Sequence, residues 1–275
     1  MFRRLIYEKS GIALNESKKE LLRTRLRARI EREGFSSYRQ YLDFVRDDKT
    51  GQALVPLLDD ISTNLTSFYR EINHFNLLRK ILPEWIANKR REGDMGWRIW
   101  SAGCSTGEEP YTLAFVMLEF LEHQIRQWNL KILATDLSVE VLKQAAEGKY
   151  DIERLKDVPQ HIASTYFTRG TGDMRTKSGK ILHNRPVAFV ADEVREMITF
   201  RRFNLMEPRF PFKRKFDFIF CRNVMIYFDK PTQETLVNKY YDVLQPGGYL
   251  FIGHSESLTG LKHNYKYVQP TVYQK

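Results

Sequence analysis

The sequence predicts an α/β protein: a mainly parallel sheet, preceded by an all-helical domain and carrying a small antiparallel β insertion. Three observations predict this arrangement. The first 90 residues hold many helix formers and few glycines, strand-like and helix-like stretches alternate from residue 95, and short strand-like pieces fill about 168–203. Alternating strands and helices favour a parallel sheet covered on both faces. We expect a helical domain at 1–75 and a larger domain at 76–275 that begins with a linker helix.

Composition narrows the class of protein. The chain is 42% hydrophobic and 13% aromatic, as in globular proteins. No apolar run approaches the roughly 18 residues of a membrane span, and the N-terminus MFRRLIYEKSG lacks a signal peptide's apolar centre. We therefore expect a cytoplasmic protein without membrane insertion. Two cysteines, Cys104 and Cys221, are too few for a disulfide framework or a zinc site, so we expect free thiols and no metal.

The strongest helical pattern of the first domain is ESKKELLRTRLRARIERE, in which Leu22, Leu26 and Ile30 recur at helical spacing. Five arginines surround this apolar stripe: Arg23, Arg25, Arg27, Arg29 and Arg32. A charge run is most often the solvated face of a helix. The net charge of +10 also favours an acidic partner, so docking on an acidic surface is the rival interpretation.

Strands and helices are predicted to alternate along the larger domain. We expect strands at 97–101, 131–136, 216–221 and 249–253, and helices at 110–123, 138–147 and about 230–244. Ser138 is a suitable N-cap, and Pro246-Gly247-Gly248 ends the last helix. Between 168 and 203, pieces such as VAFVA and ITFRRF read as antiparallel strands of the insertion, with a turn near Ser178-Gly179.

The loop IWSAGCSTGEEPY follows the first expected strand. Gly103 and Gly107 allow a tight turn and close approach to a ligand. Glu108 stands where a phosphate-binding loop has lysine, and Glu109 adds a second negative charge, so a polyphosphate would be repelled. Glu108 alone could simply complement the helix dipole.

A further acid, at the end of the next expected strand, indicates the kind of ligand. Asp136 ends the next strand, which is where a carboxylate commonly binds a ribose diol. A ribose without phosphates, joined to a cationic group, describes S-adenosylmethionine better than a dinucleotide or ATP.

Three further stretches carry a resemblance to a known family. They are STNLTSFYRE at 62–71, FCRNVMIYF at 220–228 and GHSE at 253–256. Together with STGEEPY, in the same order and approximate spacing, they resemble the chemotaxis receptor methyltransferase family, CheR. The resemblance extends over nearly the whole chain. It implies methyl transfer from S-adenosylmethionine to glutamate side chains of chemoreceptors, giving glutamyl methyl esters and S-adenosylhomocysteine.

The resemblance also implies roles for individual residues. Glu109 would bind the methionine moiety and Asp136 the ribose hydroxyls, while Arg70 and Tyr227 would be the catalytic pair nearest the transferred methyl. The implied cofactor-binding residues are Asn64, Thr66, Arg70, Glu109, Asp136, Asn204, Leu205, Asn223 and Val224.

The implied partners are the cytoplasmic domains of chemoreceptors, which would recruit the protein to membrane receptor arrays. The arginine-rich helix would dock their acidic methylation helices. The β insertion could bind a receptor C-terminal peptide as an added strand.

The chemistry agrees with this interpretation. A glutamate carboxylate, whose ordinary pKa is about 4.3, is already ionised at neutral pH, so the reaction needs alignment and no general base. A nucleic-acid methyltransferase is the main alternative, but RTRLRARIERE lacks aromatic residues for base stacking, and we expect no nucleic-acid partner. A non-catalytic adaptor that binds the cofactor is a second alternative. A serine hydrolase is disfavoured, because GHSES departs from the G-x-S-x-G nucleophile elbow of such enzymes at its last residue.

Overall fold

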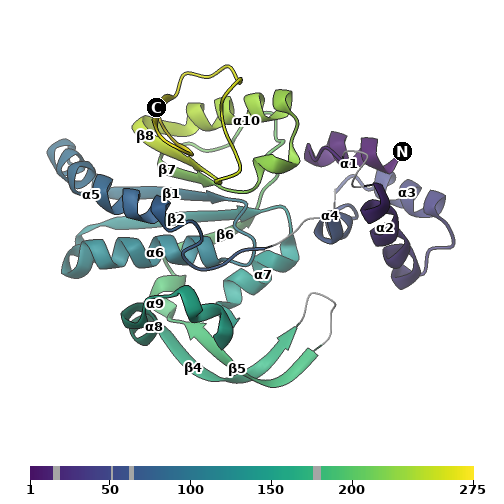
Figure 1. Ribbon diagram of the computed structural model, residues 1–275, viewed down its shortest axis with the longest axis horizontal. Helices are drawn as coiled ribbons and strands as arrows, with labels where there is room; N and C mark the ends of the chain where they lie inside the picture. Colours follow the sequence, from purple (N-terminus) through teal and green to yellow (C-terminus); the bar gives the residue numbers. More distant parts are fainter. Residues whose placement is uncertain (15–18, 51, 62–64, 176–180) are drawn as a thin grey trace.

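The computed structural model describes residues 1–14, 19–50, 52–61, 65–175 and 181–275 (Figure 1). Among these residues, no helix is both long and apolar enough to cross a membrane. Two positions named above, Asn64 and the expected turn at Ser178-Gly179, lie outside the described residues.

Four helices form a group at one end of the molecule (Figure 1). They are α1 (Phe2–Ser10), α2 (Lys19–Glu33), α3 (Tyr38–Asp47) and α4 (Val55–Ile61). The apolar stripe of α2, Leu22, Leu26 and Ile30, is buried in one cluster with residues of α3 and α4, as the spacing predicted. This small core draws on every helix of the group, because a single amphipathic helix cannot bury its own apolar face.

A seven-stranded sheet forms the centre of the larger domain, in the order β6-β2-β1-β7-β8-β10-β9. Its strands are β1 (Gly96–Ala102), β2 (Asn129–Asp136), β6 (Ile198–Arg202), β7 (Phe216–Cys221), β8 (Leu244–Ile252), β9 (Lys266–Gln269) and β10 (Val272–Gln274). The five strands from β6 to β8 are parallel, and β10 and β9 are antiparallel to their neighbours. β1 lies between β2 and β7, so the strand order reverses there. Such a reversal opens a ligand crevice at the carboxyl ends of the strands.

Helices cover both faces of this sheet. They are α5 (Asn73–Glu92), α6 (Glu108–Leu121), α7 (Val139–Glu147) and α10 (Lys230–Val243), and the expected helices at 110–123, 138–147 and 230–244 are thereby confirmed. Ser138 caps α7 by accepting a hydrogen bond from the N–H of Val141 at 3.3 Å, again as predicted. The last helix ends at Val243, and the Pro-Gly-Gly stretch expected to end it lies inside β8, which already begins at Leu244.

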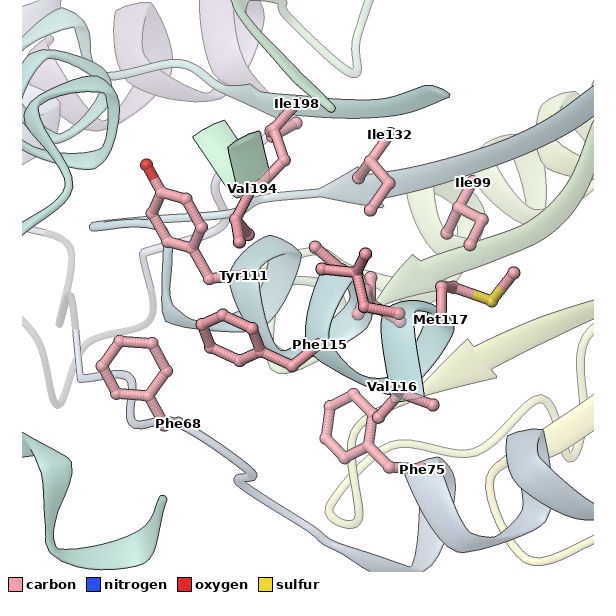
Figure 2. Packing of buried hydrophobic residues seen from close by; sticks show 14 of the residues in the cluster. Phe68, Phe75, Ile99, Tyr111, Phe115, Val116, Met117, Ile132, Val194 and Ile198 are labelled. Carbon is pink, nitrogen blue, oxygen red and sulfur yellow. The ribbon is translucent and has the colours of Figure 1, made fainter. Parts of the chain in front are cut away.

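Successive side chains of the strands point to opposite faces of the sheet and pack into two hydrophobic cores. Ile99 of β1 packs with α5 and α6 on one face, whereas its neighbour Trp100 packs with α10 on the other. Figure 2 shows the first core, with Ile99, Phe75 of α5, and Val116 and Met117 of α6. Phe68 is buried in this core too, so the chain joins the sheet soon after it leaves the helical group. The domain boundary expected near residue 75 stays a prediction.

The antiparallel insertion exists but is composed differently from the expectation. Its three strands, in the order β3-β5-β4, are β3 (Lys149–Asp151), β4 (Phe167–Arg175) and β5 (Ile181–Val190). The assignment of ITFRRF to the insertion was wrong, because these residues form β6, which pairs in parallel with β2 at the edge of the main sheet. A short alternating run shows that it is a strand but not which strand it pairs with.

Short helical segments complete the chain. They are η2 (Glu122–Gln127), η3 (Ile152–Asp157), α8 (Gln160–Tyr166), α9 (Asp192–Arg195) and η4 (Met225–Tyr227). The helical group is tied to the larger domain near η4, where Ile12 forms an isolated antiparallel bridge with Phe228 and the N–H of Ala13 donates to the carbonyl of Tyr227 at 2.8 Å.

Candidate active site

A cavity of about 310 Å³ lies at the switch point of the sheet, where β1, β2 and β7 end. Its walls also include Ser10 and Ile12 from the helical group. Of the residues predicted for the site, those that line the cavity are Thr66, Arg70, Glu109, Asp136, Asn204, Leu205, Asn223, Val224 and Tyr227. The structure therefore brings these residues together from five separate stretches of the chain.

The glycine loop passes close to the wall opposite it. Gly103 has a φ of +94°, and a Cβ built on it would lie 2.4 Å from Cγ2 of Val224. The N–H groups of Gly103 and Cys104 both donate to the carbonyl of Thr135, at 2.8 and 2.9 Å. This pairing fixes the loop against the end of β2, and only glycine fits at the turn.

Asp136 is held in place by the backbone on both sides. Its Oδ2 accepts from the N–H of Ser105 at 2.9 Å, and its Oδ1 accepts from the N–H of Ser138 at 3.0 Å. Burial raises the pKa of Asp136 above its ordinary value. A carboxylate oxygen has two acceptor positions, so each oxygen can still accept a ligand hydroxyl. The hydroxyl of Ser105, in the same wall, is buried and finds no hydrogen-bond partner among the residues that the structure describes.

The two glutamates of the loop point to different places. Glu109 lines the cavity, where its Oε1 accepts from the hydroxyl of Ser101 at 2.6 Å. Glu108 is fully buried, pairs with Arg154 of η3 and accepts from the hydroxyl of Thr106 at 2.7 Å. Successive helix residues are about 100° apart around the axis, so only one of the pair can face the ligand. Glu108 is a packing residue, and Glu109 is the negative group of the cavity.

Arg222 connects the carboxylate of Glu109 to that of Glu71, and the sequence patterns singled out neither Arg222 nor Glu71. Nη1 of Arg222 lies 3.0 Å from Oε2 of Glu109, and its Nη2 lies 3.1 Å from Oε2 of Glu71. Nη2 also donates to the carbonyl of Arg70. Burial raises the pKa of Glu109, and Arg222 opposes that effect. Both Arg222 and Glu71 stand in motifs that carried the family resemblance, but their contact spans 151 positions of sequence and is visible only in the fold.

Glu256, from the GHSE motif, also contributes to the site, although the sequence patterns did not single it out. It is buried after β8, and its carboxylate accepts from the N–H groups of Asn223 at 3.0 Å, Ile226 at 3.1 Å and Gly253 at 2.5 Å. Asn223 has a φ of 58°, in the left-handed region that asparagine adopts more readily than most other residues. Glu256 thus fixes the loop that forms one wall of the cavity.

Two other predicted residues make hydrogen bonds that stabilise the walls. Asn204 donates to the carbonyl of Lys9 at 2.8 Å and accepts from the N–H of Met206 at 3.0 Å, so its amide links the cavity to the end of α1. Arg70 donates to the carbonyl of Leu65 at 2.6 Å.

The five arginines of α2 differ in exposure. Arg23, Arg25, Arg27 and Arg32 are exposed, whereas the side chain of Arg29 is only 10% exposed. Arg29 pairs with Glu33 and with Asp60 of α4, both at 2.7 Å, and donates to the carbonyl of Pro56. Its predicted role in docking does not fit this position, because the buried ion pairs use its guanidinium to hold α2 on α4.

The cavity fits S-adenosylmethionine by its chemistry. Glu109 offers a carboxylate to an amino group, Asp136 offers acceptors to a ribose diol, and the buried Ser105 hydroxyl has no partner among the described residues. Gly103 approaches Val224 so closely that a side chain at this position would collide with it, so the loop can lie close to a ligand in the cavity.

Comparison with known proteins agrees with these features. Residues 1–62 match the family model described as CheR methyltransferase, all-alpha domain, and residues 64–274 match CheR methyltransferase, SAM binding domain. The chain is 40% identical to a chemotaxis protein methyltransferase of Borreliella burgdorferi, over 99% of this chain and 92% of that protein. It is 38% identical to chemotaxis protein methyltransferase 2 of Pseudomonas aeruginosa, over 98% and 90%. It is 34% identical to a chemotaxis protein methyltransferase of Escherichia coli, over 98% and 87%. The chain belongs to the CheR methyltransferase family and is an S-adenosylmethionine-dependent methyltransferase of chemotaxis.

Proposed function

We propose that this protein methylates glutamate side chains on the cytoplasmic domains of chemoreceptors. The products would be glutamyl methyl esters and S-adenosylhomocysteine. One observation carries the proposal: the described residues that line the cavity include neither histidine nor lysine, and its acidic groups are Glu109 and Asp136, each held by protein donors. Such a site suits an acceptor that is already ionised, because a neutral amine or hydroxyl acceptor would need a base.

Glu109 would bind the amino group of the methionine moiety, and Asp136 would bind the ribose hydroxyls. Asn223, Val224, Leu205 and Asn204 would enclose the nucleoside, and Thr66 would contact the cofactor from the other wall. When bound, S-adenosylmethionine supplies a methyl group activated by a sulfonium centre.

Arg70 and Tyr227 are the residues we assign to the acceptor side. Both line the cavity, and Arg70 brings a positive charge that can orient an incoming carboxylate through its planar fork. The hydroxyl of Tyr227 can donate a hydrogen bond to the same group. A glutamate carboxylate, with an ordinary pKa of about 4.3, arrives ionised, so the work of these two residues is alignment.

The receptor would be bound outside the cavity. Arg23, Arg25 and Arg27 are exposed on α2, to either side of its buried apolar stripe, and can attract the acidic helices of a receptor. β4 is an edge strand of the small sheet and could bind a receptor C-terminal peptide as an additional strand. The protein would then act in the cytoplasm, at membrane receptor arrays.

The test uses labelled S-adenosylmethionine, the full-length protein and membranes that contain candidate receptors. We expect label on the receptor that is released by mild base as methanol, because methyl esters hydrolyse where methyl amines do not. Label that resists base would refute a carboxylate acceptor. Glu109→Gln serves as the enzyme control, since it should remove the incorporation, and transfer to added RNA or DNA in the same assay would favour the nucleic-acid alternative.

A further inference from the structure

A cluster of metal-ligating side chains adjoins Arg222, which itself lines the cavity. It consists of Glu71, just before α5, His74, in the first turn of α5, and His254, just after β8. One ligand atom of each residue lies within 4.8 Å of those of the other two. These residues belong to segments far apart in the sequence and meet only because β8 ends beside the start of α5.

The neighbours of His74 fix the state of its imidazole. Nε2 of His74 lies 2.7 Å from the hydroxyl oxygen of Thr271, and that hydroxyl donates its single proton to the carbonyl of Pro270 at 2.6 Å. When the hydroxyl donates to Pro270, Nε2 carries the hydrogen and donates it to Thr271, and Nδ1 bears a lone pair.

This lone pair faces another acceptor. Nδ1 of His74 is buried, has no hydrogen-bond partner in the described part of the chain, and lies 3.5 Å from Oε2 of Glu71. In the tautomer that donates to Thr271, two acceptor atoms face each other with no proton between them, which is unfavourable in a buried place. A metal ion removes the conflict, because typical zinc distances of about 2.0–2.2 Å to nitrogen and oxygen can span the gap.

We propose that Glu71, His74 and His254 form a binding site for a borderline divalent cation, best matched by Zn²⁺. Two imidazoles and one carboxylate are a known zinc ligand set that leaves a fourth position open. Thr271 acts as the outer partner that orients a metal-bound histidine. A second cavity of about 400 Å³, lined by His74, His254 and Lys80 among others, gives the ion access. This differs from the expectation of no metal drawn from the two cysteines.

The position of the site gives it a consequence for the cofactor. Oε2 of Glu71 is the oxygen that faces His74, and it is also the oxygen that pairs with Arg222 at 3.1 Å. A metal ion on this oxygen competes with Arg222 and adds a positive charge beside it. Arg222 in turn holds Glu109, so metal binding weakens the binding of S-adenosylhomocysteine. This second step rests on the proposed role of Glu109.

Metal binding itself is tested first. The metal-free, full-length protein is titrated with Zn²⁺ against a chromophoric chelator, and Co²⁺ is used in parallel for its absorption spectrum. We expect one ion per chain, and His254→Ala and His74→Gln should each weaken binding by at least roughly tenfold. Gln keeps an amide that can reach Thr271. His123→Ala, which removes an exposed histidine of η2, is the matched control and should bind as the unchanged protein does. Equal affinity in the unchanged protein and in His254→Ala would overturn the site.

The link to the cofactor is tested by calorimetry with S-adenosylhomocysteine, with and without saturating Zn²⁺. We expect Zn²⁺ to weaken the affinity in the unchanged protein and in His123→Ala, but not in His254→Ala. Stoichiometric metal binding at these residues without this effect would refute the link. Failure of S-adenosylhomocysteine to bind in the absence of metal would instead count against the proposed cofactor residues.

Discussion

Nη1 of Arg222 lies 3.0 Å from Oε2 of Glu109, and this ion pair joins the end of β7 to the first turn of α6. The side chain of Arg222 is 2% exposed and that of Glu109 is 13% exposed. Glu71 shares the same guanidinium, so one buried cation holds two carboxylates at the edge of the cavity. Arg222 is therefore a positioning residue for the group that we assign to the methionine moiety.

Replacing this arginine tests the positioning role. Arg222→Lys keeps the charge but loses the planar fork, so it should lower the free energy of unfolding by about 1–3 kcal/mol. It should also weaken S-adenosylhomocysteine binding, measured by calorimetry, by roughly tenfold. Arg185→Lys is the matched control, because Arg185 pairs with Asp151 in the small sheet at 3.2 Å and is 38% exposed. That exposed pair should contribute about 0–1 kcal/mol. Equal effects of the two changes would contradict the assigned role.

The roles of Glu109 and Asp136 can be distinguished by comparing the binding of S-adenosylhomocysteine with that of adenosine. Glu109→Gln removes the partner of the amino group, so affinity for S-adenosylhomocysteine should fall by about 10–100-fold while affinity for adenosine stays unchanged. Asp136→Asn should weaken both ligands, because both contain the ribose. Calorimetric titration of each variant with each ligand provides the measurement. A loss of adenosine binding in Glu109→Gln would place that residue at the nucleoside instead.

Asp59 of α4 should make stability depend on pH. Burial, together with the nearby charges of Asp136 and Asp60, raises its pKa to about 6, against the opposing effects of Ser138 and Arg29. The folded-state pKa lies above that of the unfolded chain, so the folded protein binds the proton more tightly. Stability is then lost as the pH rises from the unfolded value towards about 6.

Asp59→Asn should consequently raise Tm at about pH 8 by more than at about pH 4, as thermal melts would record. The adjacent Asp60→Asn is the matched control with the opposite sign. Asp60 pairs with the buried Arg29 at 2.7 Å, so its removal should lower Tm at the higher pH. A lower Tm in Asp59→Asn at the higher pH would show that the ionised carboxylate stabilises the fold.

Receptor docking on α2 is tested by charge reversal. The double change Arg23→Glu and Arg25→Glu should raise the apparent KM for receptor by roughly fivefold or more at low salt, and less at high salt. Affinity for S-adenosylhomocysteine should not change, because both side chains are exposed outside the cavity. The control is Arg90→Glu with Arg91→Glu, which changes the net charge equally at the far end of α5 (Figure 1). The same KM in both double variants would remove α2 from the docking surface.

Local patterns of the sequence determined much of the fold. The buried stripe of α2, the Ser138 cap and the strands that end in the glycine loop and in Asp136 each depend on residues close together in the chain. Side-chain periodicity and capping are local properties, so they can be read without the partner. The acidic loop also indicated the class of cofactor, because charge type alone disfavours a polyphosphate.

Tertiary structure decided which groups meet. It placed β6 beside β2, since strand pairing is set between distant segments. It turned Glu109 into the cavity and Glu108 away, and it buried Arg29 among acids. It also brought Glu71 against Arg222 and Glu256 against Asn223, two residues that line the cavity. It likewise set His74 against Glu71 and Thr271. The energy of such contacts depends on burial and on separations of a few ångströms, which the fold alone fixes.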